Sequence, residues 1–263
     1  MRNALKTRHV QGNNASPASV PQSLEEFIAA GRKITESLPE EPGALYGELT
    51  QRLRDDVGTG LEATVSSKGA GAVLVRAASA QYPRAWVEAA NAFGPLYARL
   101  TGANGRGWHT SISDPALIGK TTRLSDFGVV TIRKNAGYLA VRWEDIPNAI
   151  HEYAHRLQSA LPGLQAKFME MHRRRTRGEA LQSLKVLEPK SRYRHDEMTR
   201  KDHYIEAYWG KEYDGTPLEV MTMAMQTMLS GRRWEKGRLF RKLYTEDREM
   251  FDFIVGLLFH WRP

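Results

Sequence analysis

The first patterned stretch of the chain begins at Ser23, after a polar segment that has no periodic apolar face. Ser23 and Glu26 fit the S-x-x-E capping box, in which two side chains satisfy free backbone N–H groups at the start of a helix. Apolar residues then recur at helical spacing, so we predict one helix from residue 23 to about 38 and another over 45–53. Residues 1–22 are rich in turn formers, and we expect a disordered or extended tail there.

The middle of the chain carries the clearest signals for β-strands. Residues 127–133 and 138–142 are rich in β-branched and aromatic side chains and flank the turn sequence Lys-Asn-Ala-Gly, which predicts a β-hairpin. The apolar run 72–76 predicts a short buried strand, and residues 83–100 have the apolar spacing of a helix. Beyond residue 145 almost every segment has helical spacing. The pattern therefore predicts a predominantly helical α+β fold with a small sheet.

The length and composition are those of a chain that can build a core. Its 263 residues are 41% hydrophobic and 26% charged, which excludes disorder throughout. We expect a tail over 1–22, a helical N-terminal segment over 23–80 and a metal-binding domain over 81–263. The chain has no cysteine, which excludes disulfides, thiolate metal ligands and a cysteine nucleophile.

Charge and hydropathy bear on partners and location. The formal net charge is +8, and residues 156–202 carry 12 basic against 6 acidic side chains, so this segment is a candidate surface for DNA or an acidic partner. The apolar run 253–259 is far shorter than the ~20 residues that span a bilayer. No apolar core of a secretory signal is visible near the start of the sequence. We expect no membrane partner.

The motif that carries chemistry is H-E-x-x-H, formed by His151, Glu152 and His155. Residues four apart share one face of a helix, so both imidazoles can bind one Zn²⁺ ion. Glu152 lies one residue along, where a carboxylate can take a proton from a metal-bound water. Asp145 as N-cap and Pro147 in the first turn predict a helix over 146–161.

Two histidines do not complete a catalytic zinc site, which takes three protein ligands and leaves one position for water. No third histidine follows at the H-x-x-G-x-x-H spacing, so the third ligand comes from further along the chain. The residues leave several candidates open, namely His172, His195, His203 and the acidic residues of 196–219, among them Asp202 and Glu219.

Several downstream blocks occur in a recognisable order. After H-E-x-x-H come R-R-T-R-G-E at 174–179, D-E-M-T-R at 196–200, Y-W-G-K-E-Y at 208–213, a Glu-led apolar helix from 219, and the ending 249–258. Together these blocks resemble the zincin-like region of bacteriophage head-morphogenesis (minor head) proteins, which have relatives among predicted metallopeptidase toxins. The resemblance covers about residues 80–260.

The resemblance implies a zincin-like metallopeptidase domain over 81–263, with Glu219 as the third zinc ligand. The residues themselves leave an alternative, because Thr216 and Glu219 also fit a capping box, in which Glu219 satisfies only backbone N–H groups. The apolar helix that follows favours burial of this carboxylate, and a buried carboxylate needs a partner such as a metal ion. Tyr204, Tyr208 and Tyr213 are candidates to stabilise an oxyanion, although packing is the commoner role of a tyrosine.

The leading hypothesis for function is a zinc-dependent metallopeptidase acting on a protein or peptide. His151, His155 and Glu219 would hold Zn²⁺, Glu152 would activate water, and the strand 138–142 would be an edge strand that aligns an extended peptide. The resemblance also implies two alternatives. One is a virion or head-assembly protein that contacts phage head or portal proteins, and the other is a secreted metallopeptidase effector. We expect a cytoplasmic or virion-associated protein.

Overall fold

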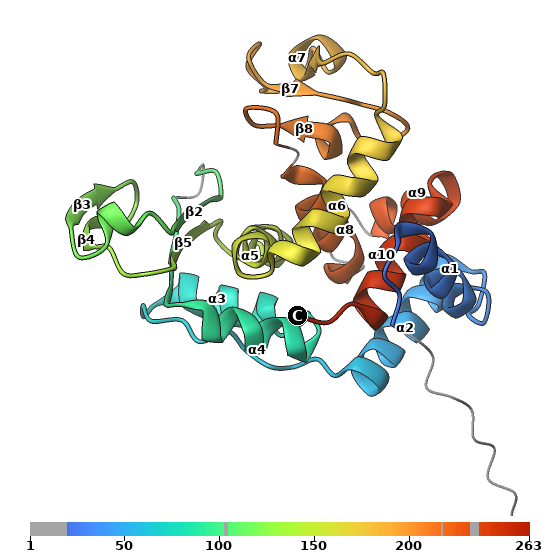
Figure 1. Ribbon diagram of the computed structural model, residues 1–263, viewed down its shortest axis with the longest axis horizontal. Helices are drawn as coiled ribbons and strands as arrows, with labels where there is room; N and C mark the ends of the chain where they lie inside the picture. The colour runs from blue at the N-terminus through green and yellow to red at the C-terminus, as the bar shows by residue number, and fades with distance from the viewer. Residues whose placement is uncertain (1–19, 103–104, 217, 232–236) are drawn as a thin grey trace, which may run out of the picture.

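The computed structural model describes residues 20–102, 105–216, 218–231 and 237–263, and the predicted tail lies outside them except for residues 20–22. Figure 1 shows the arrangement of the elements along the chain. In chain order they are α1 (Leu24–Thr35), α2 (Pro42–Arg52), η1 (Leu53–Val57), α3 (Ala70–Ser79), α4 (Arg84–Phe93), β1 (Leu96–Leu100), β2 (Trp108–Ile112), η2 (Pro115–Leu117), β3 (Thr121–Leu124), β4 (Gly128–Thr131), β5 (Ala136–Val141), α5 (Ile146–Ala160), α6 (Pro162–Arg175), β6 (Gln182–Ser183), α7 (Leu184–Leu187), β7 (Met198–Thr199), η3 (Ala207–Gly210), β8 (Lys211–Glu212), α8 (Glu219–Leu229), α9 (Arg238–Glu246) and α10 (Arg248–His260).

Local capping signals account for two of the helices that sequence predicted. Ser23 caps α1, and both hydrogen bonds of the capping box with Glu26 are present. Asp145 caps α5 through a hydrogen bond from the backbone N–H of Asn148, and Pro147 lies in the first turn. The predicted helix over 146–161 is thereby confirmed to within one residue at its end.

Three strands form the sheet that lies beside α5. Their order is β1-β5-β2, with β1 parallel and β2 antiparallel to the central strand β5. All six residues of β5 are buried, as expected of a central strand covered on both faces. The predicted edge strand over 138–142 is therefore wrong, because its position is central and β2 occupies the edge.

The predicted hairpin between 127–133 and 138–142 is also wrong. β4 pairs with β3 as a separate two-stranded ribbon, and β5 pairs with β1 and β2 instead. The ribbon projects from the body of the molecule at one end (Figure 1). Strand-forming composition predicts that a segment is extended but does not identify its pairing partner. In this chain β5 pairs with β2 and with β1, and the residues of β1 lie about 40 positions earlier in the sequence.

Two further predictions about the first hundred residues are corrected. Residues 72–76 are part of α3 rather than a strand, since a short apolar run fits a buried helix as well as a buried strand. The predicted helix over 83–100 ends at Phe93, and Leu96–Leu100 forms β1. Gly94 ends the helix in an extended conformation, packed closely against the backbone of Asn135.

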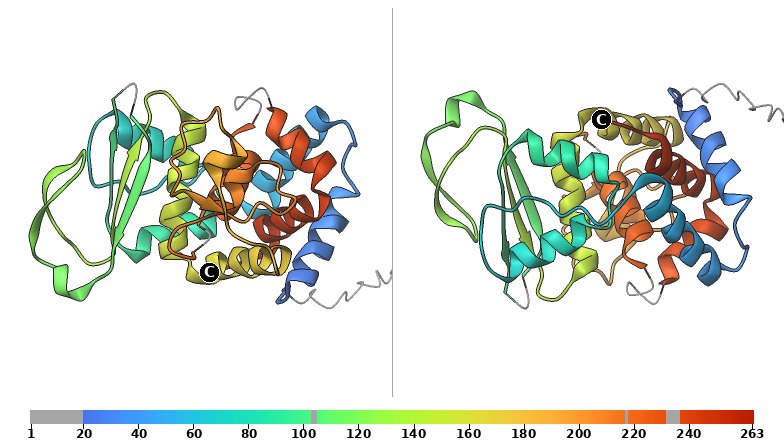
Figure 2. Two further views of the ribbon diagram at one scale, coloured as in Figure 1. Left: turned by 90° about the horizontal axis from the view of Figure 1, so that it is seen from above. Right: turned by 90° about the horizontal axis from the view of Figure 1, so that it is seen from below.

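The core is built around α5, in which every residue from 149 to 158 is buried. In Figure 2 the sheet lies on one side of this helix and α8 with α10 on the other. One hydrophobic cluster joins residues from α1 through α10, so the predicted N-terminal segment and the predicted domain share a core. The architecture is thus predominantly helical α+β, but residues 176–216 are mostly turns with a small β6-β7-β8 sheet, not helices as predicted.

The first and last described helices, α1 and α10, cross at very close range. Gly31 and Gly256 lie at the crossing, and a Cβ built on Gly31 would overlap the backbone carbonyl of Asp252. The buried carboxylate of Asp252 accepts hydrogen bonds from Thr35 at 2.8 Å and from Arg248 at 2.8 Å. Small residues permit the approach, and the paired carboxylate ties the two helices together.

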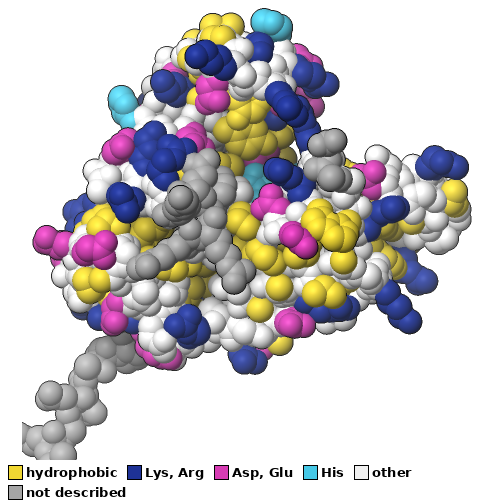
Figure 3. Space-filling view, turned by 180° about the vertical axis from the view of Figure 1, so that it is seen from behind, with side chains coloured by type: hydrophobic (Ala, Val, Ile, Leu, Met, Phe, Trp, Pro, Cys, Tyr) yellow, Lys and Arg dark blue, Asp and Glu magenta, His cyan; other side chains and the backbone are white. Residues whose placement is uncertain are grey.

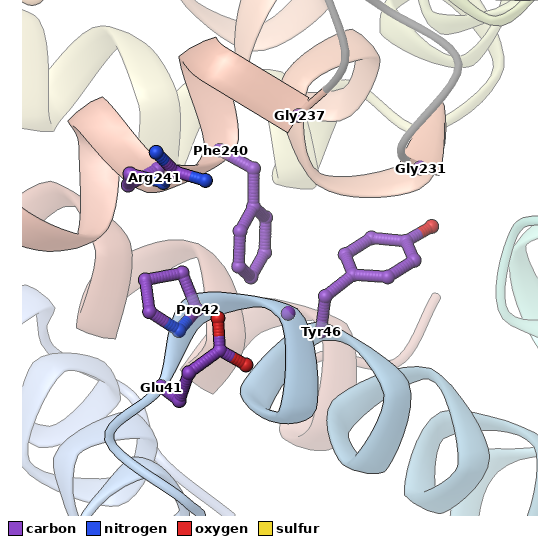
Figure 4. A pocket seen from close by; sticks show the side chains of 8 residues that line it. Glu41, Pro42, Tyr46, Gly231, Gly237, Phe240 and Arg241 are labelled. Atoms are coloured by element: carbon purple, nitrogen blue, oxygen red, sulfur yellow. The ribbon is translucent and has the colours of Figure 1, made fainter.

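A second contact joins α2 to α9, where the ring of Phe240 meets Tyr46 edge to face at 5.1 Å between centroids. A small pocket of about 240 Å³ lies between these helices, with Glu41 and Arg241 at its margin (Figure 4). No helix within the described ranges is long and apolar enough to cross a membrane.

Candidate metal centre

The helix α5 presents two imidazoles on one face. His151 and His155 are four residues apart, and both are buried, with side-chain exposures of 11% and 4%. Their ring centroids lie 5.1 Å apart. Helical spacing therefore brings the two rings together on a buried face, as the H-E-x-x-H pattern predicts.

The structure brings Glu219 to the same point from α8. Glu219 Oε2 lies 3.2 Å from His151 Nε2 and 3.8 Å from His155 Nε2. Glu219 is the first residue of α8, Leu218 is the N-cap, and no side chain caps this helix. The capping-box alternative for Glu219 is therefore wrong, and Pro217 within it lies outside the described residues.

These three groups have the spacing that a tetrahedral metal site requires. Ligand atoms held ~2.0–2.1 Å from a tetrahedral ion are ~3.3 Å from one another. The two distances from Glu219 Oε2 bracket this value, and the ligand atoms of His151, His155 and Glu219 all lie within 4.8 Å of one another. The donor set, two imidazoles and one carboxylate, could thus hold a metal ion with little movement.

Two glutamines orient the imidazoles from behind. Gln226 Oε1 lies 3.1 Å from His151 Nδ1, and Gln158 Oε1 lies 2.8 Å from His155 Nδ1. Gln158 Nε2 donates to the backbone carbonyl of Leu218 at 2.6 Å, which fixes its amide so that the oxygen faces His155. Each Nδ1 therefore donates its proton to an amide oxygen, and each Nε2 is left to face the centre.

Three hydroxyl groups hold the carboxylate of Glu219. Tyr208 and Tyr213 donate to Oε1 at 3.0 and 2.6 Å, and Thr222 donates to Oε2 at 2.8 Å. With both phenols on Oε1, the carboxylate directs Oε2 alone to His151 and His155. Packing was the expected role of these tyrosines, and the structure adds a specific one, because both position the third candidate ligand.

The electrostatics of these buried groups depend on their pairing. Burial lowers the pKa of His151, but the hydrogen bond and charge of Glu219 outweigh burial and raise it above its ordinary value. Burial, with the neighbouring His109, holds the pKa of His155 well below its ordinary value. Burial acts to raise the pKa of Glu219, but the hydrogen bond and charge of His151 keep it well below its usual range. Glu219 is thus ionised and His155 neutral, as metal ligands must be, whereas His151 would have to release a proton to bind a metal ion.

Glu152 lies beside His151, His155 and Glu219 but is not one of the three candidate ligands in this group. Its carboxylate is buried, and Oε1 accepts a hydrogen bond from Asn148 Nδ2 at 3.2 Å. The backbone of Gly107 packs so closely that an added Cβ would overlap Oε1. Burial raises the pKa of Glu152 to about 7, partly offset by the charge of His151. A carboxyl group that titrates near neutral pH suits a general base.

His109 was missed by sequence reasoning. It comes from β2, and its ring stacks on that of His155 with centroids 3.7 Å apart. Burial lowers its pKa to about 4, so the ring is neutral. With Glu152 and His155, it forms a second group whose ligand atoms lie close enough together to hold a metal ion. A lone histidine in a loop-rich stretch has no sequence signal, and only the pairing of β2 with β5 brings it to α5.

The other candidate ligands lie elsewhere. His172 is buried, but its Nδ1 is 3.1 Å from the Tyr204 hydroxyl and its Nε2 is 3.1 Å from Glu212. His195 and His203 are exposed. Within the described residues, none of these three histidines belongs to a group that could hold a metal ion.

Two arginines of the basic segment 156–202 form hydrogen bonds or ion pairs inside the protein. Arg156 is buried and donates to two backbone carbonyls beneath the sheet. Arg175 is also largely buried and pairs with Asp202 at 2.6 Å and with Asp247 at 2.9 Å. Asp202, an alternative third ligand, is therefore committed to this ion pair. Contact of the remaining basic residues with DNA or an acidic partner stays a prediction.

A cleft of about 550 Å³ opens over the centre, and His151 and Glu152 contribute to its lining. Tyr208, Tyr213 and Gln226 line it as well, so both tyrosines that hold the third ligand border this cleft. Figure 3 shows a hollow beside the lobe formed by α7 and β6–β8, with a histidine side chain in it and Lys and Arg side chains nearby.

Comparison with protein-family models, with curated proteins and with solved structures finds no match to this chain.

Proposed function

We propose that this protein is a zinc-dependent metallopeptidase with a zincin-like fold. The observation that carries the proposal is the convergence of His151, His155 and Glu219 on one buried point. Glu152 follows the first of these histidines and borders the cleft that opens over them. A buried cluster of two imidazoles and an ionised carboxylate is the donor set of catalytic zinc, with one position left for water.

Zinc, when bound, lowers the pKa of a coordinated water to ~7 and polarises a carbonyl group. The residues of the chain supply the proton chemistry. Glu152 has a pKa of about 7 and is held by Asn148, so it can take a proton at neutral pH and pass it to a leaving amine. Gln158 and Gln226 hold the imidazoles, while Tyr208 and Tyr213 hold Glu219.

The edge strand β2 supports a polypeptide substrate. It pairs with β5 on one side, and none of the described strands pairs with its other side. His109 on β2 stacks against His155, so the strand runs beside the candidate metal centre. An extended peptide that adds to this edge would lie beside the candidate metal centre.

The test combines metal content with turnover. Protein purified without chelator should contain one zinc per chain by elemental analysis and should hydrolyse unfolded casein. A chelator should abolish hydrolysis, and added zinc should restore it. Glu152→Gln should keep zinc and fold but lose hydrolysis by at least ~10²-fold. A wild-type protein that is zinc-loaded and inactive on unfolded protein substrates would refute the peptidase assignment.

The ordered motifs shared with phage minor head proteins support a second proposal, a head-assembly role with head or portal proteins as partners. This role does not need the proton transfer of Glu152. Complementation of a phage defective in the gene separates the two functions. Glu152→Gln should complement if the role is structural and fail if hydrolysis is required, whereas His151→Ala should fail in both cases.

A further inference from the structure

The cleft over the candidate metal centre is lined by an excess of positive charge. Arg106, Arg142, Arg192 and Lys211 line it, against the carboxylates of Glu152 and Glu197. Lys211 Nζ lies 2.7 Å from Glu197 Oε1, so these two charges neutralise each other. Glu197 also accepts a hydrogen bond from a backbone N–H. Three arginines are left around a single general-base carboxylate.

Two of these guanidinium groups form no close ion pair in the described part of the chain, although the charge of Arg106 helps to lower the pKa of Glu197. Among the described residues, neither Arg106 nor Arg192 lies within ion-pair distance of a carboxylate, and both are exposed. Arg106 Nη2 donates to the backbone carbonyl of Arg192 at 3.4 Å, which brings the two loops together at the cleft. The guanidinium of Arg142 lies 3.6 Å from Asp145, in a pair that is half exposed and contributes little.

The three arginines lie close to the reacting centre. Arg106 precedes Gly107, whose backbone packs on Glu152. The backbone N–H of Arg142 donates to Asn148, which in turn donates to Glu152. These two arginines therefore flank the general base.

Arg192 lies beside Arg106, whose guanidinium donates to its backbone carbonyl. It precedes Tyr193, whose ring stacks on Tyr208 at 5.7 Å, and Tyr208 donates to Glu219. A chain that crosses the cleft would thus pass arginines near the general base and near the tyrosines that hold the third ligand. Arginine binds carboxylates through paired N–H donors in a fixed planar geometry.

We propose that this cleft selects polypeptide segments that carry several Asp or Glu side chains close to the scissile peptide bond. The inference rests on the proposed peptidase function, and it names the substrate class of that site. Acidic side chains would pair with Arg106, Arg142 and Arg192. Nucleic acid fits less well, because the edge of β2, with which no described strand pairs, suits an extended peptide.

Binding is measured first, on the zinc-loaded Glu152→Gln protein, so that hydrolysis does not interfere. The probes are fluorescein-labelled twelve-residue peptides of alternating Ala and Glu, with the Gln and Lys versions for comparison and a dT12 oligonucleotide as the competing polyanion. We expect the Glu peptide to bind at least tenfold more tightly than the Gln peptide, and the preference to shrink as salt rises. Equal binding of Glu and Gln peptides, or tighter binding of dT12, would overturn the proposal.

Charge variants then test which residues carry the preference. Arg106→Gln, Arg142→Gln and Arg192→Gln should each reduce the preference for Glu over Gln about three- to fivefold. Arg123→Gln is the matched control, since Arg123 is exposed on β3 of the projecting ribbon and outside the cleft. If Arg123→Gln reduces the preference as much as the cleft variants, net charge and not the cleft is responsible.

A second readout keeps this inference separate from the proposed function. Wild-type protein loaded with zinc is incubated with a proteome-derived peptide library, and cleavage sites are mapped by mass spectrometry. Cleavage without enrichment of Asp or Glu near the cut refutes the acidic preference and leaves the peptidase function intact. Tight binding of the Glu peptide without any cleavage refutes the peptidase function and leaves the preference of the cleft for acidic peptides intact.

Discussion

Gln158 offers a sharp test of how α5 is coupled to α8. Its amide oxygen accepts from His155 Nδ1 at 2.8 Å, and its amide nitrogen donates to Leu218 at 2.6 Å, one residue before Glu219. One side chain thus fixes a histidine ligand and the start of the helix that supplies the carboxylate. The substitution Gln158→Met keeps the length and the helix propensity of the side chain and removes both hydrogen bonds.

The expected loss of unfolding free energy follows from these two hydrogen bonds. The bond to His155 is buried and the bond to Leu218 is partly buried, and the loss of each such hydrogen bond costs ~1–1.5 kcal/mol net. The metal-free variant should therefore lose about 2–3 kcal/mol of unfolding free energy, which lowers the melting temperature by roughly 5–10 °C for a chain of this size. Loss of a partner behind a ligating imidazole typically weakens metal binding by ~10–100-fold.

Urea denaturation in the presence of a chelator measures the first quantity, and competition with a chromophoric zinc chelator measures the second. Gln165→Met is the matched control. Gln165 is equally buried, in α6, and within the described part of the chain neither atom of its amide has a hydrogen-bond partner. This substitution should be neutral or stabilising and should leave zinc affinity unchanged. If Gln158→Met and Gln165→Met change stability and zinc affinity equally, the coupling argument is refuted.

Three further predictions concern the third ligand, the general base and the helix crossing. Glu219→Gln should keep its fold by circular dichroism but bind less than ~0.1 zinc per chain, because an amide replaces a carboxylate poorly on Zn²⁺. Glu152 has a folded pKa of about 7 against an ordinary 4.5, so it destabilises the metal-free protein as pH rises from 4.5 to 7. Glu152→Gln should therefore be more stable than wild type by ~3 kcal/mol above pH 7 and by little near pH 5, as measured by urea denaturation. Gly31→Ala should cost at least ~2 kcal/mol by the same method, since its Cβ overlaps the Asp252 carbonyl.

Each of these predictions has an outcome that contradicts it. Full zinc occupancy in Glu219→Gln would move the third ligand to another residue. A stability difference that does not change with pH in Glu152→Gln would show that burial does not raise the pKa of this carboxyl. Gly47→Ala is the control for Gly31→Ala, because an added Cβ at Gly47 in α2 meets nothing within 4 Å and should stabilise by ~0.5–1 kcal/mol. Similar effects of the two glycine changes would contradict the tight crossing.

The sequence predicted the elements whose signals are local. The start of α5 follows from Asp145 and Pro147, and the shared face of His151 and His155 follows from helical geometry. Glu219 was reached mainly through the order of the motifs, with weaker support from the apolar helix that follows it, while Thr216 left a capping box as the alternative.

Features that depend on contacts between distant segments were not predictable in this way. The partner strands of β5 come from residues 96–100 and 108–112, and no local pattern identifies that pairing. His109 and Gln226 reach the centre only because β2 and α8 pack beside α5. A neutral amide that bonds to a histidine has no signal in composition, charge or spacing. The glutamines that orient the ligands, Gln158 and Gln226, could therefore not be predicted from the sequence.

The crossing of α1 and α10 has a consequence for synthesis on the ribosome. Arg32 and its partner Asp252 are 220 residues apart. At a translation rate of ~5–20 residues per second, about 10–45 s pass between their appearance, although a helix itself forms within microseconds. During that interval the apolar face of α1, with Leu24, Phe27 and Ile28, has no α10 to cover it. The nascent chain therefore displays a short amphipathic helix to chaperones long before its partner is made.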